Sequence, residues 1–109
     1  MGMKWVDRTG REIHPTDLIA YAASQGDSPT LKFGRVQKLK ESKPRWKGDE
    51  ETHPKLGILS IEFGYDWNSG SREVCWHLQN NGKEVTITPD KVIVVPTAAL
   101  SPEMLNLLK

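Results

Sequence analysis

Apolar and polar residues alternate in short runs, separated by glycine and proline, over most of the chain after residue 16. The apolar run at 18–23 is short and bounded by turn residues, which favours a buried strand. The next run, 30–41, alternates until Gly34, where the period shifts by one residue. A glycine at such a shift is typical of a β-bulge, so this run predicts one long, bent strand.

Residues 42–54 are rich in charge and proline and have hardly any apolar content. They predict a mobile basic loop over 42–55. Apolar positions return at 56–63, where the period shifts again after Ile58. This run predicts a third strand.

The clearest local signal is the Asn81-Gly82 pair between two alternating segments, 74–79 and 85–88. Asn-Gly suits a type I′ turn because both central residues of that turn need positive φ. The sequence therefore predicts a β-hairpin here, followed by a break at 88–91 and a short last strand.

The two ends of the chain differ in pattern. Residues 1–16 are mixed polar, and Pro15 disfavours a helical residue before it, so an extended lead-in is predicted. Ser101, Pro102 and Glu103 suit the N-cap, first position and first turn of a helix. A helix of barely two turns is unstable alone, so we expect it to dock on the fold or on a second copy.

These elements predict a mostly β fold, a small, strongly bent antiparallel barrel of about five strands with a short C-terminal helix. Few strands with one apolar face each must close on one another to hide that face. The expected organisation is a lead-in at 1–16, a barrel domain at 17–96, and a linker with a short helix at 97–109.

Residues 17–95 resemble SH3-like small β-barrels, including the KOW-type domains of ribosomal and transcription-elongation proteins. The resemblance rests on a Gly-x-Val element, Gly34-Arg35-Val36, in the second strand. It rests also on 89–91, which is similar to the single helical turn that leads into the closing strand of those domains. The general composition also resembles that of small accessory proteins encoded by bacteriophages.

Composition narrows the class of protein. With 109 residues, 37% of them hydrophobic and 27% charged, the chain is long and apolar enough for one domain with a core. One cysteine excludes a disulfide framework and a four-thiolate zinc site. No apolar run reaches the ~18–20 residues of a membrane span and no signal-peptide core is evident, so we expect a cytoplasmic domain without membrane contact.

The formal net charge of +1 conceals an uneven distribution. Residues 32–47 hold seven of the 15 basic residues and one acidic residue, Glu41, a local charge of +6. Three acidic residues follow directly at 49–51. A solvated surface is the simplest interpretation of such a run.

Two binding hypotheses use this segment. Arg45 and Trp46 form an anchor pair of the kind enriched at protein interfaces, which predicts a protein partner whose activity the chain alters. Alternatively, the lysines contact phosphates and Trp46 stacks on a base, which predicts nucleic-acid binding. Trp46 folded back into a barrel end is the purely structural alternative. The candidate partner-binding residues are Lys38, Lys40, Lys43, Arg45, Trp46, Lys47, Tyr65 and Trp67.

Tyr65 and Trp67 lie within a segment of turn residues, 65–71, and predict a second aromatic patch. Together with Tyr21 they would form an aromatic cage for a cationic side chain, as in methyl-lysine readers of the SH3-like fold.

Enzymatic and metal chemistry find little support in the sequence. Cys75 and His77 share a strand face, but His14 and His53, the other ligands of a Cys/His metal set, lie in separate segments without paired spacing. A Cys75–His77 nucleophile pair lacks an orienting third group. We therefore expect a non-enzymatic binding module without cofactor or metal, either a monomer or a weak homodimer through the C-terminal helix.

Overall fold

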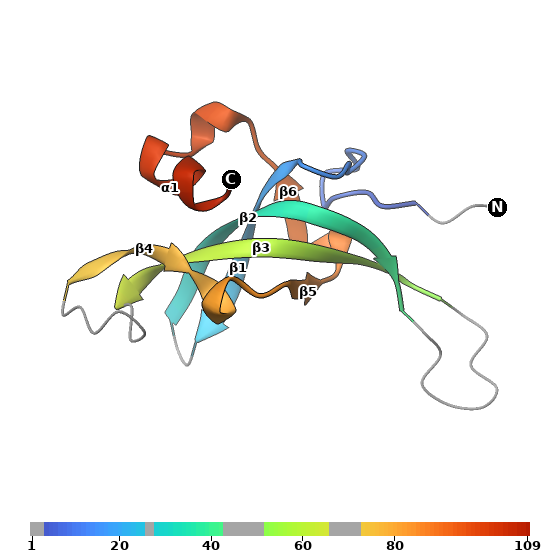
Figure 1. Cartoon of the computed structure of the whole chain (residues 1–109). Coiled ribbons are helices and arrows are strands. Elements are labelled where there is room, and N and C mark those ends of the chain that lie inside the picture. Colours follow the sequence, from blue (N-terminus) through green and yellow to red (C-terminus); the bar gives the residue numbers. More distant parts are fainter. Residues whose placement is uncertain (1–3, 26–27, 43–51, 66–72) are drawn as a thin grey trace.

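The computed structural model describes residues 4–25, 28–42, 52–65 and 73–109, and in them the chain forms one antiparallel sheet and a short C-terminal helix (Figure 1). The mostly β class predicted from the sequence is therefore confirmed. The strands are β1 (Leu18–Gln25), β2 (Ser28–Glu41), β3 (Pro54–Tyr65), β4 (Val74–Leu78), β5 (Val85–Ile87) and β6 (Val92–Val94). The helical segments are η1 (Gln79–Gly82), η2 (Pro89–Lys91), η3 (Thr97–Ala99) and α1 (Pro102–Leu107).

The strands follow the order β4-β3-β2-β1-β6, and β5 pairs with β3. The long strands β2 and β3 arch across the molecule, and β6 pairs with β1 at the far end of the sheet (Figure 1). In the described residues this sheet is not closed into a barrel, so the predicted barrel is not confirmed.

The hairpin predicted at Asn81-Gly82 is wrong. β4 and β5 both pair with β3, at 61–65 and 56–58, so they follow one another along one edge of β3. Asn80, Asn81 and Gly82 have φ values of 56°, 55° and 79°. Three consecutive residues with positive φ make a helical turn, after which the chain continues along β3. A type I′ turn has only two such residues and reverses the direction of the chain.

β3 is buried on both faces, which explains the shift of apolar positions after Ile58. Leu56 and Ile58 belong to one core cluster, and Leu59 and Ile61 belong to another on the opposite face. Side chains along β3 thus alternate regularly between the two faces. The apparent shift after Ile58 arises because both faces, not one, are covered by apolar side chains from there on. We call the face of Leu56 and Ile58 the inner face, and the face of Leu59 and Ile61 the helix face.

The bulge predicted at Gly34 lies three residues further along β2. The β2–β3 ladder pairs Val36 with Ile58 and Lys38 with Gly57, which leaves Gln37 as the extra residue. Gly34 has a different role, because a Cβ atom there would lie 2.8 Å from the Leu59 carbonyl oxygen. The glycine allows β2 and β3 to approach closely.

The C-terminal segment covers the helix face. Leu100, Met104 and Leu108 are buried against Leu59 and Ile61. The Ser101 hydroxyl accepts a hydrogen bond from the Met104 backbone N–H, which confirms the predicted N-cap. The short helix thus docks on its own sheet.

The N-terminal segment, predicted as a lead-in, contributes to the core and ties strands together. Ile13 is buried on the inner face beside Trp5. The Trp5 indole N–H lies 3.0 Å from both the Lys40 and the Lys55 carbonyl oxygens, so it joins β2 to β3. This contact begins the fold well before residue 17.

Asp7 links the N-terminal segment to β6. Its carboxylate is buried and accepts backbone N–H donors from Thr9, Arg11 and Val94 at 2.8–2.9 Å, and the Thr9 hydroxyl at 2.7 Å. Burial alone would raise the pKa of this carboxyl, but the hydrogen bonds, that from Val94 foremost, bring it below its ordinary value of 3.8. The charged form is therefore the one that the fold stabilises.

We expect Asp7→Asn to lower the free energy of unfolding by about 2 kcal/mol at pH 7, because an amide has one acceptor oxygen and turns N–H donors toward N–H donors. A lowered folded-state pKa gives stability that is present above the unfolded-state pKa and is lost as pH falls through the folded-state value. Urea denaturation should therefore show a difference in the free energy of unfolding between the variant and the parent protein, and this difference should become smaller as the pH is lowered. Asp90→Asn, at an exposed position, is the control, and an equal loss in both variants would contradict this role.

Candidate functional site

The structure describes three of the eight predicted partner-binding residues. Lys38 and Tyr65 are exposed, and Lys40 is half-buried. The other five lie outside the described residues: Lys43, Arg45, Trp46, Lys47 and Trp67. The predicted anchor pair and the Trp46 stacking hypothesis therefore stay predictions.

The described basic residues of the +6 segment do not share one exposed surface. Lys32 is 4% exposed and points to the inner face, where its Nζ lies 3.1 Å from the Glu62 carboxylate. The Lys40 ammonium pairs with Glu84. Two of the lysines that the charge pattern suggested for phosphate contacts are thus neutralised within the fold.

A polar network occupies the inner face around Glu62. One Glu62 oxygen pairs with Lys32, and the other lies 3.3 Å from His77 Nε2. His77 Nδ1 lies 3.2 Å from the Cys75 carbonyl oxygen. Glu62 and His77 face each other directly on β3 and β4. Both ring nitrogens of His77 therefore have neighbours.

Tyr21 forms a second part of this network. Its hydroxyl lies 2.7 Å from Ser60 Oγ and 3.1 Å from Gln79 Oε1, and Ser60 Oγ lies 3.0 Å from the same amide oxygen. Burial raises the pKa of the Tyr21 phenol, the hydrogen bond with Ser60 opposes that effect, and the nearby Glu62 charge adds to it. The phenol remains protonated and acts as a donor.

The predicted aromatic cage does not form between Tyr21 and Tyr65. Tyr21 is 7% exposed and packs in the inner-face core. Tyr65 follows Ile61 by four residues on β3, so the alternation places it on the helix face. The two rings lie on opposite sides of the sheet.

Among the residues that the structure describes, no group of three or more metal-ligating side chains comes together. Cys75 and His77 share β4, but His14 lies in the N-terminal segment and His53 precedes β3. The Cys/His set that the composition allows is therefore dispersed.

The most distinctive surface is an exposed apolar region on the helix face, beyond the part that α1 covers. Side chains on β2, β3 and β4 form it, and four are large and exposed: Phe63 at 57%, Leu31 at 56%, Tyr65 at 50% and Val74 at 45%. We call it the aromatic patch, defined by Leu31, Phe33, Phe63, Tyr65, Val74 and Trp76.

The register of the strands assembles the aromatic patch. Tyr65 lies opposite Val74, and Phe63 lies opposite Trp76. The Trp76 ring is 5.4 Å from the Phe63 ring, and it meets Phe33 edge-on at 5.7 Å. Such contacts order the rings before any partner arrives.

Sequence reasoning found only Tyr65 of this patch. The signal for the others was present, because Phe63 and Tyr65 continue the alternation of Leu59 and Ile61, and Val74 alternates with Trp76. It was missed because the shift after Ile58 was interpreted as an irregularity and the second apolar face went unnoticed. The aromatic patch is the exposed end of the helix face.

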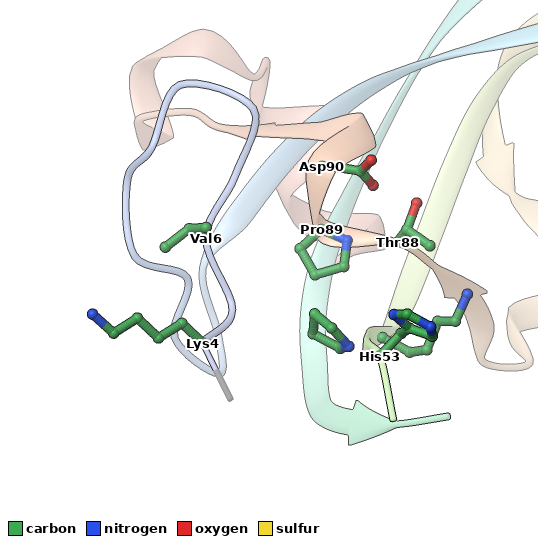
Figure 2. Close-up of a pocket in the computed structure, with 8 residues that line it drawn as sticks. Lys4, Val6, His53, Thr88, Pro89 and Asp90 are labelled. Atoms are coloured by element: carbon green, nitrogen blue, oxygen red, sulfur yellow. The ribbon is translucent and has the colours of Figure 1, made fainter. Parts of the chain in front are cut away.

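A cavity of about 320 Å³ lies between the N-terminal segment and η2. Figure 2 shows Val6 and Pro89 on its two sides, while the Lys4 side chain extends away from Pro89. The Thr88 hydroxyl beside it is buried and has no hydrogen-bond partner. Charged groups do not converge on a common point here, so the cavity lacks the features of an anion or metal site.

Comparison with known proteins identifies no relative, so the interpretation of function rests on the geometry of the structure. No protein-family model, curated protein or solved structure matches the chain. None of the helices in the described residues has the length and apolar character required to cross a bilayer.

We expect Lys32→Met to lower the free energy of unfolding by about 3 kcal/mol, because it leaves Glu62 partly buried without its cation. Chemical denaturation of Lys32→Met, Glu62→Leu and the double variant measures the coupling between the two side chains. The double variant should lose clearly less than the sum of the single losses. Lys38→Met, at an exposed position on the same strand, should change stability by less than about 0.5 kcal/mol, and strictly additive losses would show that the pair is uncoupled.

Proposed function

We propose that this protein is a non-enzymatic binding module, a small regulatory protein that attaches to a protein partner through the aromatic patch and alters that partner's activity. The observation that carries the proposal is the exposure of Phe63, Tyr65 and Val74 side by side on one sheet face, with Leu31 exposed on the same face of β2. Soluble monomers rarely expose apolar patches of this kind without a binding role.

The chemistry of the patch suits a protein partner. Aromatic residues are enriched where interfaces bind most tightly, since they bury a large area at a low entropic cost. The rings around Trp76 are already in contact with one another. Binding therefore need not order them, which reduces the free-energy cost of association.

Nucleic-acid binding through the basic segment is the alternative. It requires cations that are free to contact phosphates, and Lys32 and Lys40 are engaged by Glu62 and Glu84. Lys38 is exposed. Of the three lysines described in this segment, two are thus engaged by carboxylates, so the described surface favours a protein partner.

An SH3-like architecture belongs to the same proposal. The helical turn η2 directly precedes β6, and β6 pairs with the first strand of the sheet, β1. The resemblance stated for 17–95 implies a closing strand entered in this way. SH3-like domains are small binding folds, which agrees with a module that acts by attachment.

Selection from a random peptide library displayed on phage, with the purified protein immobilised, tests the proposal directly. We expect enriched peptides rich in aliphatic and aromatic residues. Calorimetry should show that Phe63→Ser weakens their binding at least about tenfold, because a ring at the centre of the patch is lost. Ile93→Ser, at an exposed apolar position on β6, is the matched control and should bind as the parent does.

Titration of labelled single- and double-stranded oligonucleotides at two salt concentrations tests the alternative. We expect no salt-dependent binding. Salt-dependent affinity that Phe63→Ser leaves unchanged, together with a library that yields no binding peptides, would overturn the proposal in favour of nucleic acid.

A further inference from the structure

The two edge strands of the sheet, β6 and β4, differ in what lies beyond them. At one end, the outer side of β6 is occupied: the Arg8 N–H donates to the Val92 carbonyl at 2.9 Å, and the Val94 N–H donates to the Asp7 carboxylate at 2.8 Å. At the other end, no strand lies beyond β4 in the described part of the chain. Among the described residues, no segment other than β3 makes a backbone hydrogen bond to β4.

The sequence of β4 lacks three features by which proteins often block an edge strand. Such strands commonly contain lysine, proline or a bulge. The sequence of β4 is VCWHL, and it pairs with β3 in an uninterrupted register from Val74 to Leu78. An edge without these features, beside an exposed apolar patch, is suited to pairing with another strand.

The pattern of β4 is the same when read in either direction from Trp76. Val74 and Leu78 are apolar and lie two residues to each side of it on one face, and Cys75 and His77 lie between them on the other. If two copies pair antiparallel about Trp76, Val74 of each copy faces Leu78 of the other. This register uses all five residues of the strand and sets apolar side chains opposite apolar side chains.

We propose that the occupant of the β4 edge is a second copy of this chain, paired through β4 about a two-fold axis at Trp76. The charges are compatible with this arrangement, because the facing pairs Val74–Leu78, Cys75–His77 and Trp76–Trp76 oppose no like charges. A two-fold axis makes each such contact twice. The two sheets become one continuous sheet.

This pairing goes beyond the proposed function and does not depend on it. The patch lies on the helix face, whereas the pairing uses the edge of the sheet. Joined at β4, the two aromatic patches form one continuous surface, with Val74 and Trp76 at its centre and Leu31 at its two ends. A protein partner would then meet a surface twice as long.

Sedimentation equilibrium of the full chain up to about 1 mM tests the association itself. We expect a reversible monomer–dimer equilibrium. An isotope-filtered Overhauser experiment on a mixture of labelled and unlabelled chains then tests the register. Val74 and Leu78 of one chain are about 13 Å apart along the strand, so a contact between their methyl groups arises only between copies.

A pair of matched variants locates the interface. Val74→Lys places an ammonium group opposite Leu78 of the second copy, twice per dimer, and should weaken association at least about tenfold. Leu31→Lys changes a somewhat more exposed apolar residue of the patch, on β2 and away from the edge, and should dimerise as the parent does.

Two outcomes overturn the inference. The first is a chain that stays monomeric at every concentration. The second is a dimer without the Val74–Leu78 contact, weakened by Leu31→Lys as much as by Val74→Lys, because that result indicates association face to face through the patch. Peptide binding that persists in a monomeric chain would still support the proposed function.

Discussion

Burial of β3 on both faces is the constraint on which the other elements depend. β3 has Leu56 and Ile58 on one side and Leu59 and Ile61 on the other, so it needs two separate covers. A single flat sheet covers neither of its own faces. The bend of the sheet and the N-terminal segment supply the inner cover, and the C-terminal helix supplies the outer one. Removal of either cover would expose a row of aliphatic side chains to water. Each Å² of apolar surface exposed in this way costs about 25 cal/mol of stability.

The second cover is short, and this has a direct result at the surface. α1 runs from Pro102 to Leu107 and packs above Leu59 and Ile61, but β3 continues to Tyr65. The apolar face of β3 therefore extends beyond the helix that protects it. The inner face at the same level is polar, with Lys32, Glu62 and His77 paired, so the two sides of one strand end differ completely in character.

The sequence predicted the local elements well and the long-range pairing less well. The strands, the break at 88–91 and the Ser101 cap follow from periodicity and from residues that act on their immediate neighbours. The hairpin failed because Asn81-Gly82 specifies positive φ but not how many residues adopt it, and Asn80 adopts it too. The aromatic patch was found only at Tyr65, because the cover on that face of β3 comes from α1, a helix that begins at Pro102, far along the chain.

The indole of Trp5 has a further consequence for the segment between β2 and β3. Trp5 bonds the carbonyls of Lys40 and Lys55, and Ser42 and His53 are joined by two more hydrogen bonds, so the base of that connection is closed by the fold itself. Closure entropy grows slowly with length, about 0.6 kcal/mol for each doubling. The connection is therefore a natural graft point, where foreign sequence can be inserted at little expense to the sheet.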